Sequence, residues 1–147
     1  MENGFEKVRH YVFDLYGTLV DIHTDEDKAE VWETAAERFC SLGAAYAPRE
    51  LKRQYAAEVE TLTAECAAAH PELQSPEIDL GTVFRRLCAR KGVTAGDGQI
   101  AALALSFRQA STEFLRAYDG ASEMLTALRK RGRVWLLSNA QSLFTRP

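Results

Sequence analysis

The sequence has 147 residues, enough for one globular domain or for one domain with a small insertion. Hydrophobic residues make up 46% and charged residues 27%, ordinary values for a globular protein that argue against disorder. The formal net charge of −3 excludes a general polyanion-binding protein, because such proteins usually carry an excess of basic residues.

Transmembrane and secretory segments are not expected. No uncharged apolar run approaches the length of a membrane-spanning helix, and the N-terminus lacks the pattern of a signal peptide. We therefore expect a cytoplasmic protein. Cys40, Cys66 and Cys88 are odd in number, widely spaced and without a C-x-x-C motif. They are predicted to be buried free thiols on the apolar sides of helices, not metal ligands or disulfide partners.

The first predicted element is a buried strand over residues 8–15, which is rich in aromatic and β-branched residues. Its apolar character suits a parallel strand that is covered on both faces. The apolar residues then recur at helical spacing in four segments, residues 25–42 with Thr24 as N-cap, 48–69, 80–91 and 97–117.

Two further elements complete the predicted order. A helix over residues 121–131 ends in basic residues, and a second buried strand follows at residues 133–137. Strands at both ends with helices between them indicate an α/β protein. Two strands do not make a sheet that stands alone. We therefore expect either that the sheet is completed from elsewhere or that the chain stops before its fold does.

Asp14 is the first candidate for chemistry. A carboxylate is costly to bury in an apolar run, but it is tolerated at the carboxyl end of a strand, the edge where open α/β sheets bind ligands. Gly17 and Thr18 follow, giving a tight turn and a hydroxyl group. Such an Asp14 can act as a nucleophile that forms an ester or an acyl-phosphate, which water then cleaves. The alternative is an aspartate that caps its own turn.

Ser138 and Asn139 are the matching candidates after the second strand. They are the first polar residues beyond it, so they are expected at the same edge of the sheet as Asp14. A hydroxyl and an amide at that place can bind an anionic group. The alternative is an ordinary passage from strand to loop.

Residues 13–19 (FDLYGTL) and 136–139 (LLSN) together resemble the first two motifs of the haloacid dehalogenase-like (HAD) hydrolase superfamily. The first motif is a hydrophobic strand ending in D-x-[D/Y]-G-T-[L/V], and the second is a strand ending in Ser or Thr. The resemblance implies a Rossmann-type α/β core, here incomplete with about two parallel strands, and an inserted helical cap. The implied core covers residues 1–20 and 118–147, and the implied cap covers residues 21–117.

The resemblance also implies roles for the motif residues. Asp14 would be the covalent nucleophile, Thr18 would steady the motif, and Ser138, often followed in the family by an Asn such as Asn139, would hydrogen-bond the anionic group. Tyr16 stands where the family's phosphatases usually carry the aspartate that protonates the leaving group. Tyrosine at that position is typical of the family's 2-haloacid dehalogenases, whose halide leaves without a proton.

Two further expectations depend on the same resemblance. Arg53 lies in a local pattern similar to that of the cap arginine which grips the substrate carboxylate in dehalogenases, although a solvated helix-surface arginine is the alternative. Asp14 would also be a metal ligand if the protein is a Mg²⁺-dependent phosphatase, whereas a dehalogenase would need no cofactor.

The family's third and fourth motifs, a lysine and a pair of acids, follow the second motif, whereas this sequence ends eight residues after Asn139. We therefore expect a chain truncated after the second motif that is itself inactive or nearly so. Three hypotheses stay open: a 2-haloacid dehalogenase type, which Tyr16 favours; a phosphate-monoester phosphatase, which the superfamily favours; and a non-catalytic remnant or binding protein. The expected partner is a small-molecule substrate, without nucleic acid or membrane, and a homo-oligomer is left open.

Overall fold

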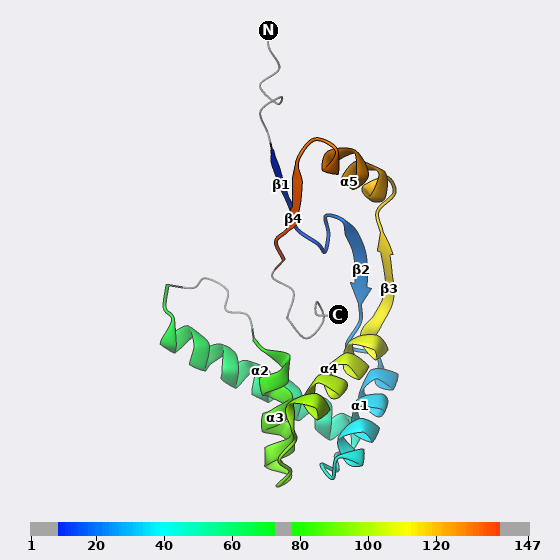
Figure 1. The fold of residues 1–147 in the computed structure, drawn as a ribbon. Helices are drawn as coiled ribbons and strands as arrows, with labels where there is room; N and C mark the ends of the chain where they lie inside the picture. Colours follow the sequence, from blue (N-terminus) through cyan, green and yellow to red (C-terminus); the bar gives the residue numbers. More distant parts are fainter. Residues whose placement is uncertain (1–8, 73–77, 139–147) are drawn as a thin grey trace. The chain divides into compact units, whose positions relative to one another are not determined.

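The computed structural model describes residues 9–72 and 78–138, which fold as two compact units (Figure 1). Of the described residues, one unit contains 9–24 and 112–138, and the other contains 25–72 and 78–111. Within these ranges the first unit holds four strands and one helix, and the second is helical. Strands and helices together make the protein α/β, as the sequence predicted.

The strands of the first unit form two separate pairs. β1 (His10–Phe13) pairs in parallel with β4 (Arg133–Leu136), with Phe13 opposite Leu136. β2 (Val20–Thr24) pairs antiparallel with β3 (Thr112–Ala117). A short turn connects α5 (Ala121–Arg129) to β4, and the helix packs against this strand. The parallel pair therefore joins two segments from opposite ends of the sequence.

Strands were predicted at residues 8–15 and 133–137, and β1 and β4 lie within these ranges. The prediction that these strands are buried is wrong. Val12 is 58% exposed, Trp135 49% and Leu136 56%. A parallel strand is buried only when neighbours cover both of its faces. In the described part of the chain, α5 is the helix that packs on this pair.

Four helices form the second unit: α1 (Ala29–Ser41), α2 (Pro48–Ala69), α3 (Leu80–Arg90) and α4 (Asp97–Ser111). Their apolar faces meet in one core, in which Phe39, Phe84 and Leu87 are almost fully buried. Phe39 and Phe84 meet edge-to-face with ring centroids 5.4 Å apart, an arrangement that adds to the stabilisation from burial alone. The four predicted helices are confirmed, with two changes of boundary.

Both changes of boundary concern the ends of this helical unit. The segment that includes Thr24 extends as β2, so Thr24 is not an N-cap, and α1 begins only after Lys28. The predicted fourth helix ends at Ser111, and Thr112–Ala117 is strand β3. In each case pairing between β2 and β3 overrides the helical pattern of the local sequence.

Among the described residues of the helical unit, the buried polar side-chain atoms all have hydrogen-bond partners. The Tyr46 hydroxyl donates to the carbonyl oxygen of Leu87 over 2.7 Å. Glu58, only 3% exposed, accepts from Arg90 and lies beside Arg86, so its buried charge is compensated.

The cysteines are free thiols, as predicted, but the prediction that all three are buried is wrong. Cys88 is buried, Cys66 is intermediate and Cys40 is exposed. Burial raises the pKa of the Cys88 thiol, which keeps it protonated and unreactive. No helix in the described residues is both long enough and apolar enough to cross a membrane.

Candidate active site

Asp14 and Ser138 follow the two strands of the parallel pair at its carboxyl edge. Asp14 comes directly after β1, and Ser138 comes two residues after β4. The ladder continues one step beyond the strands, because the Leu137 amide donates to the carbonyl oxygen of Phe13 over 2.8 Å. The structure therefore brings the two residues to the same edge, although more than a hundred residues of sequence separate them.

The turn after Asp14 is built by backbone hydrogen bonds. The carbonyl oxygen of Leu15 accepts from the amides of Leu19 and Val20, each over 2.9 Å. The Gly17 amide donates back to the carbonyl oxygen of Val20 over 2.8 Å. Gly17 has φ +75°, a left-handed conformation that glycine adopts without the steric cost of a Cβ atom. The side chain of Leu19 is buried and anchors the turn.

This hydrogen bonding bears on what the Asp14 side chain does. The amides of residues 17–20 donate to backbone oxygens, and in the described part of the chain no hydrogen bond or ion pair engages the Asp14 carboxylate. Asp14 is exposed. A capping aspartate would accept from a backbone amide two or three residues later. The carboxylate is thus left available to a ligand, and the turn-capping alternative is not what the fold displays.

Tyr16 and Thr18 lie on this same turn. Tyr16 is half-buried and forms an isolated bridge with Val20, so the backbone that carries its ring is fixed. Thr18 is exposed, and its amide donates to the Leu15 carbonyl oxygen over 3.4 Å. An added Cβ at Gly17 would meet nothing within 4 Å, which leaves open space beside the turn.

The remaining predicted site residues are placed as follows. Ser138 is half-buried. Asn139 lies outside the described residues. Arg53 is exposed on α2, in the helical unit, where the Lys91 hydrogen bond is the main cause of the lowered pKa of Glu50 and the charge of Arg53 adds to it. Its predicted role in gripping a substrate carboxylate stays a prediction.

The donor set at the carboxyl edge fits Mg²⁺ only in part. Asp14 offers the carboxylate oxygens that Mg²⁺ prefers. Among the described residues, however, no group of three or more His, Cys, Asp or Glu side chains is gathered closely enough to hold a metal ion. Asp14 can therefore serve as one ligand, and the described residues do not form a complete metal site.

The sequence analysis missed the antiparallel β2–β3 pair that follows this turn. The Tyr118 amide donates to the Leu19 carbonyl oxygen over 3.0 Å, and Arg116 binds Asp21 through its Nε (3.0 Å) and terminal nitrogen (2.9 Å). The residues after the turn alternate apolar and polar from Val20 to His23, a period of two that is typical of a strand. That alternation was the signal for β2.

A comparison with models of protein families assigns the chain to a family. The sequence model of the haloacid dehalogenase-like hydrolases matches residues 8–146, nearly the whole chain. The chain belongs to the haloacid dehalogenase-like hydrolases. Its parallel β1–β4 pair with Asp14 at the carboxyl edge agrees with the Rossmann-type core of this hydrolase family. A comparison with curated proteins gave no match.

Proposed function

We propose that this HAD-like hydrolase uses Asp14 as a covalent nucleophile and acts on a small soluble 2-haloacid. The observation that carries the proposal is the exposed Asp14 carboxylate at the end of β1, which the following turn does not use for its own hydrogen bonds. A carboxylate held at the edge of a parallel pair, without a hydrogen-bond or ion-pair partner among the described residues, is suited to attack an electrophile.

The proposed reaction has two steps. An oxygen of Asp14 attacks the carbon that carries the halogen, the carbon–halogen bond breaks, and halide leaves with the bonding electron pair. Water then adds to the carbonyl carbon of the resulting ester, and cleavage releases a 2-hydroxyacid, a proton and the restored carboxylate. Ser138, at the same edge, is proposed to donate its hydroxyl hydrogen bond to the anionic group of the substrate.

Tyr16 supports carbon–halogen cleavage over phosphate-ester cleavage. An alkoxide leaving group is a strong base, and a positioned acid typically contributes about 10²–10⁴-fold to its departure. A phenol is a weaker acid than a carboxylic acid and replaces it poorly in that role. Halide is a weak base and leaves without a proton.

Phosphate-monoester hydrolysis is the second candidate. The observation that favours it is that Asp14 and Ser138 follow the two paired strands at one edge, because a carboxylate and a hydroxyl placed there also suit a tetrahedral phosphoryl group. Mg²⁺ would be needed there, and Asp14 would be one of its ligands. It would neutralise charge on the transferred group.

A side-by-side screen separates the two reactions. The product of the whole reading frame that contains these residues is incubated with 2-chloropropionate, an alkyl phosphate and an aryl phosphate, each with and without Mg²⁺. The proposal predicts halide release from 2-chloropropionate that does not depend on Mg²⁺. Mg²⁺-dependent cleavage of the alkyl phosphate without halide release would establish the phosphatase. Turnover of none of the three would favour a binding protein without catalysis.

A further inference from the structure

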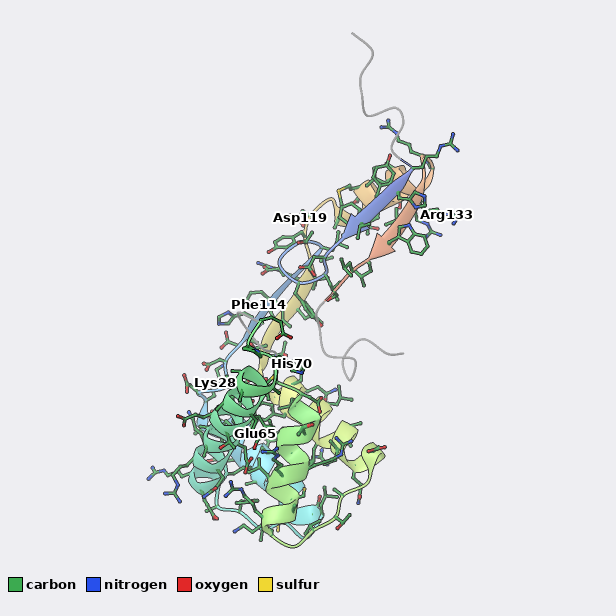
Figure 2. The ribbon with its side chains drawn as sticks, turned by 90° about the vertical axis from the view of Figure 1, so that its left-hand side faces the viewer. Lys28, Glu65, His70, Phe114, Asp119 and Arg133 are labelled. Carbon is green, nitrogen blue, oxygen red and sulfur yellow. The ribbon has the colours of Figure 1, made fainter. Side chains whose placement is uncertain are left out.

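The opposite end of the parallel pair, where β1 and β4 begin, carries a concave surface of about 810 Å³. Gly132 lines it together with six residues that are all basic: Arg9, His10, Arg129, Lys130, Arg131 and Arg133. We call this surface the basic pocket. Figure 2 labels Arg133, which starts β4 at this end of the molecule. Among the described residues no acidic side chain lines the pocket.

Backbone contacts gather these cations in one place. The Arg133 amide donates to the Arg9 carbonyl oxygen over 2.8 Å. A Cβ atom added at Gly132 would lie 2.4 Å from that same oxygen. The two backbone segments can therefore approach this closely only because residue 132 has no side chain. The position of Arg9 relative to residues 131–133 is therefore set by the backbone and not by flexible side chains.

Helix-end electrostatics explain only part of the cluster. Arg129 is in the last turn of α5 and Lys130 is its C-cap, where cations interact favourably with the helix dipole. Arg9 and Arg133 belong to the start of the two strands, where no helix end calls for a positive charge. In the described part of the chain none of these four side chains forms an ion pair.

Three arginines of the helical unit have carboxylate partners. Arg85, Arg86 and Arg90 are each paired with a carboxylate there. Gathered cations without carboxylates repel one another, and a bound anion would relieve that repulsion. What distinguishes the basic pocket is that five Lys and Arg side chains share one concavity, which offers a site for an anion from solution.

We propose that the basic pocket binds a compact anion that carries several phosphate groups, such as a diphosphate or triphosphate. Guanidinium groups bind phosphate oxygens through two parallel hydrogen bonds, and five Lys and Arg side chains share this one concavity. A nucleic-acid duplex would require a longer basic stripe and is disfavoured by the net charge of −3. β1 separates the pocket from Asp14 by about 13 Å, so an occupant would leave the carboxyl edge accessible.

Calorimetric titration of the 147-residue chain with tripolyphosphate tests the proposal. We expect saturable binding at one site. Arg131→Gln with Arg133→Gln should raise the Kd at least about tenfold, because two bidentate partners are lost. The control, Arg38→Gln with Arg49→Gln, removes the same charge from exposed positions in the helical unit and should change the Kd less than about twofold. Far-UV circular dichroism verifies that each variant keeps its fold.

A second pair, Arg129→Gln with Lys130→Gln, tests the other side of the pocket and should also weaken binding. Equal weakening by the Arg38/Arg49 control would show a general charge effect and overturn the proposal. Absence of binding at concentrations up to about 1 mM would overturn it as well. Saturable binding of a single-stranded oligonucleotide, without binding of tripolyphosphate, would replace it with a nucleic-acid surface.

Discussion

Asp14 owes its availability to its neighbour Leu15, whose carbonyl oxygen accepts from several amides of the following turn. Because the backbone closes the turn, the carboxylate is not needed for its stability. A residue that contributes little to the fold can be replaced without unfolding the protein, and this makes the proposed role of Asp14 directly testable.

Asp14→Asn should abolish turnover in the product of the whole reading frame while the fold is kept. An amide is too weak a nucleophile to open the reaction, so the rate should fall by several orders of magnitude. The measurement is halide and phosphate release under single-turnover conditions, and Asp97→Asn is the control. Asp97 is exposed, and its ion pair with Arg85 lies at the surface, so its loss should leave the rate unchanged. An Asp14→Asn protein with the original kcat would exclude Asp14 as nucleophile.

Isotope labelling examines the same step without a substitution. A single turnover in ¹⁸O-water should place the label in the Asp14 carboxylate, because water attacks the carbonyl carbon of the ester intermediate. Mass spectrometry of the peptide that contains Asp14 detects it. With 2-chloropropionate as substrate, label found only in the 2-hydroxyacid would indicate direct attack by water instead.

Tyr16→Asp tests whether this position sets the type of reaction. A carboxylic acid two residues after the nucleophile can protonate an alkoxide, so cleavage of an alkyl phosphate should rise, by up to about 10²-fold. Halide release should not gain from the change. Tyr16→Phe is the matched control, which removes the hydroxyl and keeps the ring. If the Tyr16→Asp and Tyr16→Phe variants cleave the alkyl phosphate at equal rates, protonation of the leaving group does not limit the reaction.

At this scale the sequence could predict that Asp14 and Ser138 lie at the same edge, because residues after parallel strands lie at one edge of a sheet. It could not predict that the Asp14 carboxylate is unused by its turn, since this depends on where the Leu15 carbonyl oxygen points. The exposure of Cys40 was missed for a similar reason. A helical pattern indicates which side of a helix is apolar, and the neighbouring helices determine how far that side is covered.

Among the elements, β3 shows most clearly how local signals can mislead. Thr112–Ala117 contains Glu, Leu, Arg and Ala, which favour helices, and it directly continues α4. Its pairing with β2 decides the outcome, with Asp21 opposite Arg116 and Ile22 opposite Leu115. Cross-strand pairs of opposite charge stabilise such a ladder, and they become visible only when both strands are considered together.

Gly132→Ala should destabilise the β1–β4 pair by about 1–3 kcal/mol, the usual range for forced overpacking. The new methyl group would lie 2.4 Å from the Arg9 carbonyl oxygen, so the two strands must move apart. The control is Gly98→Ala in α4, where the added methyl group meets nothing within 4 Å and should stabilise the helix by up to about 1 kcal/mol. Thermal and urea denaturation compare the two variants. If Gly132→Ala leaves the stability unchanged, the close approach of the two backbone segments is not required.

For the whole molecule, the two units differ sharply in how much they bury. The large apolar core belongs to the helical unit, whereas Leu19 and Ala121 are the buried apolar residues in the described part of the strand-containing unit. Alternation of strand and helix patterns was enough to predict an α/β protein. The division of the core could not be predicted, because it depends on which helices pack against one another.

Residues 25–111 should fold on their own as a cooperative helical domain. They contain the buried core, and their two ends meet, since the Asp25 amide donates to the Ser111 carbonyl oxygen over 2.8 Å. Circular dichroism and calorimetry of the excised segment should show a helical spectrum and one sharp melting transition. The matched variant Phe84→Ala should lower stability by about 3–5 kcal/mol. A broad, non-cooperative melt would contradict this expectation.

The helical unit should also lose stability in acid. Hydrogen bonds from Lys91 and Arg86 lower the pKa values of Glu50 and Glu65. A carboxyl group with a lowered folded-state pKa stabilises the fold above its unfolded pKa of about 4.3, and this contribution is lost as the pH falls through the folded value. The melting temperature should therefore fall below about pH 4.5. Glu50→Gln with Glu65→Gln should flatten that dependence, and an unchanged slope would show that other groups control it.

The meeting of Asp25 and Ser111 has a consequence for the order of folding. β1 must find β4 across more than a hundred residues, and the entropy of closing a loop grows with its length. Once the helical unit has formed, its ends are already together, β2 and β3 begin beside each other, and the span left to close is only about a third as long. The reduction in loop-closure cost is about 1 kcal/mol. We therefore expect the helical unit to form before the Asp14 edge, with the candidate active site among the last parts of the chain to assemble.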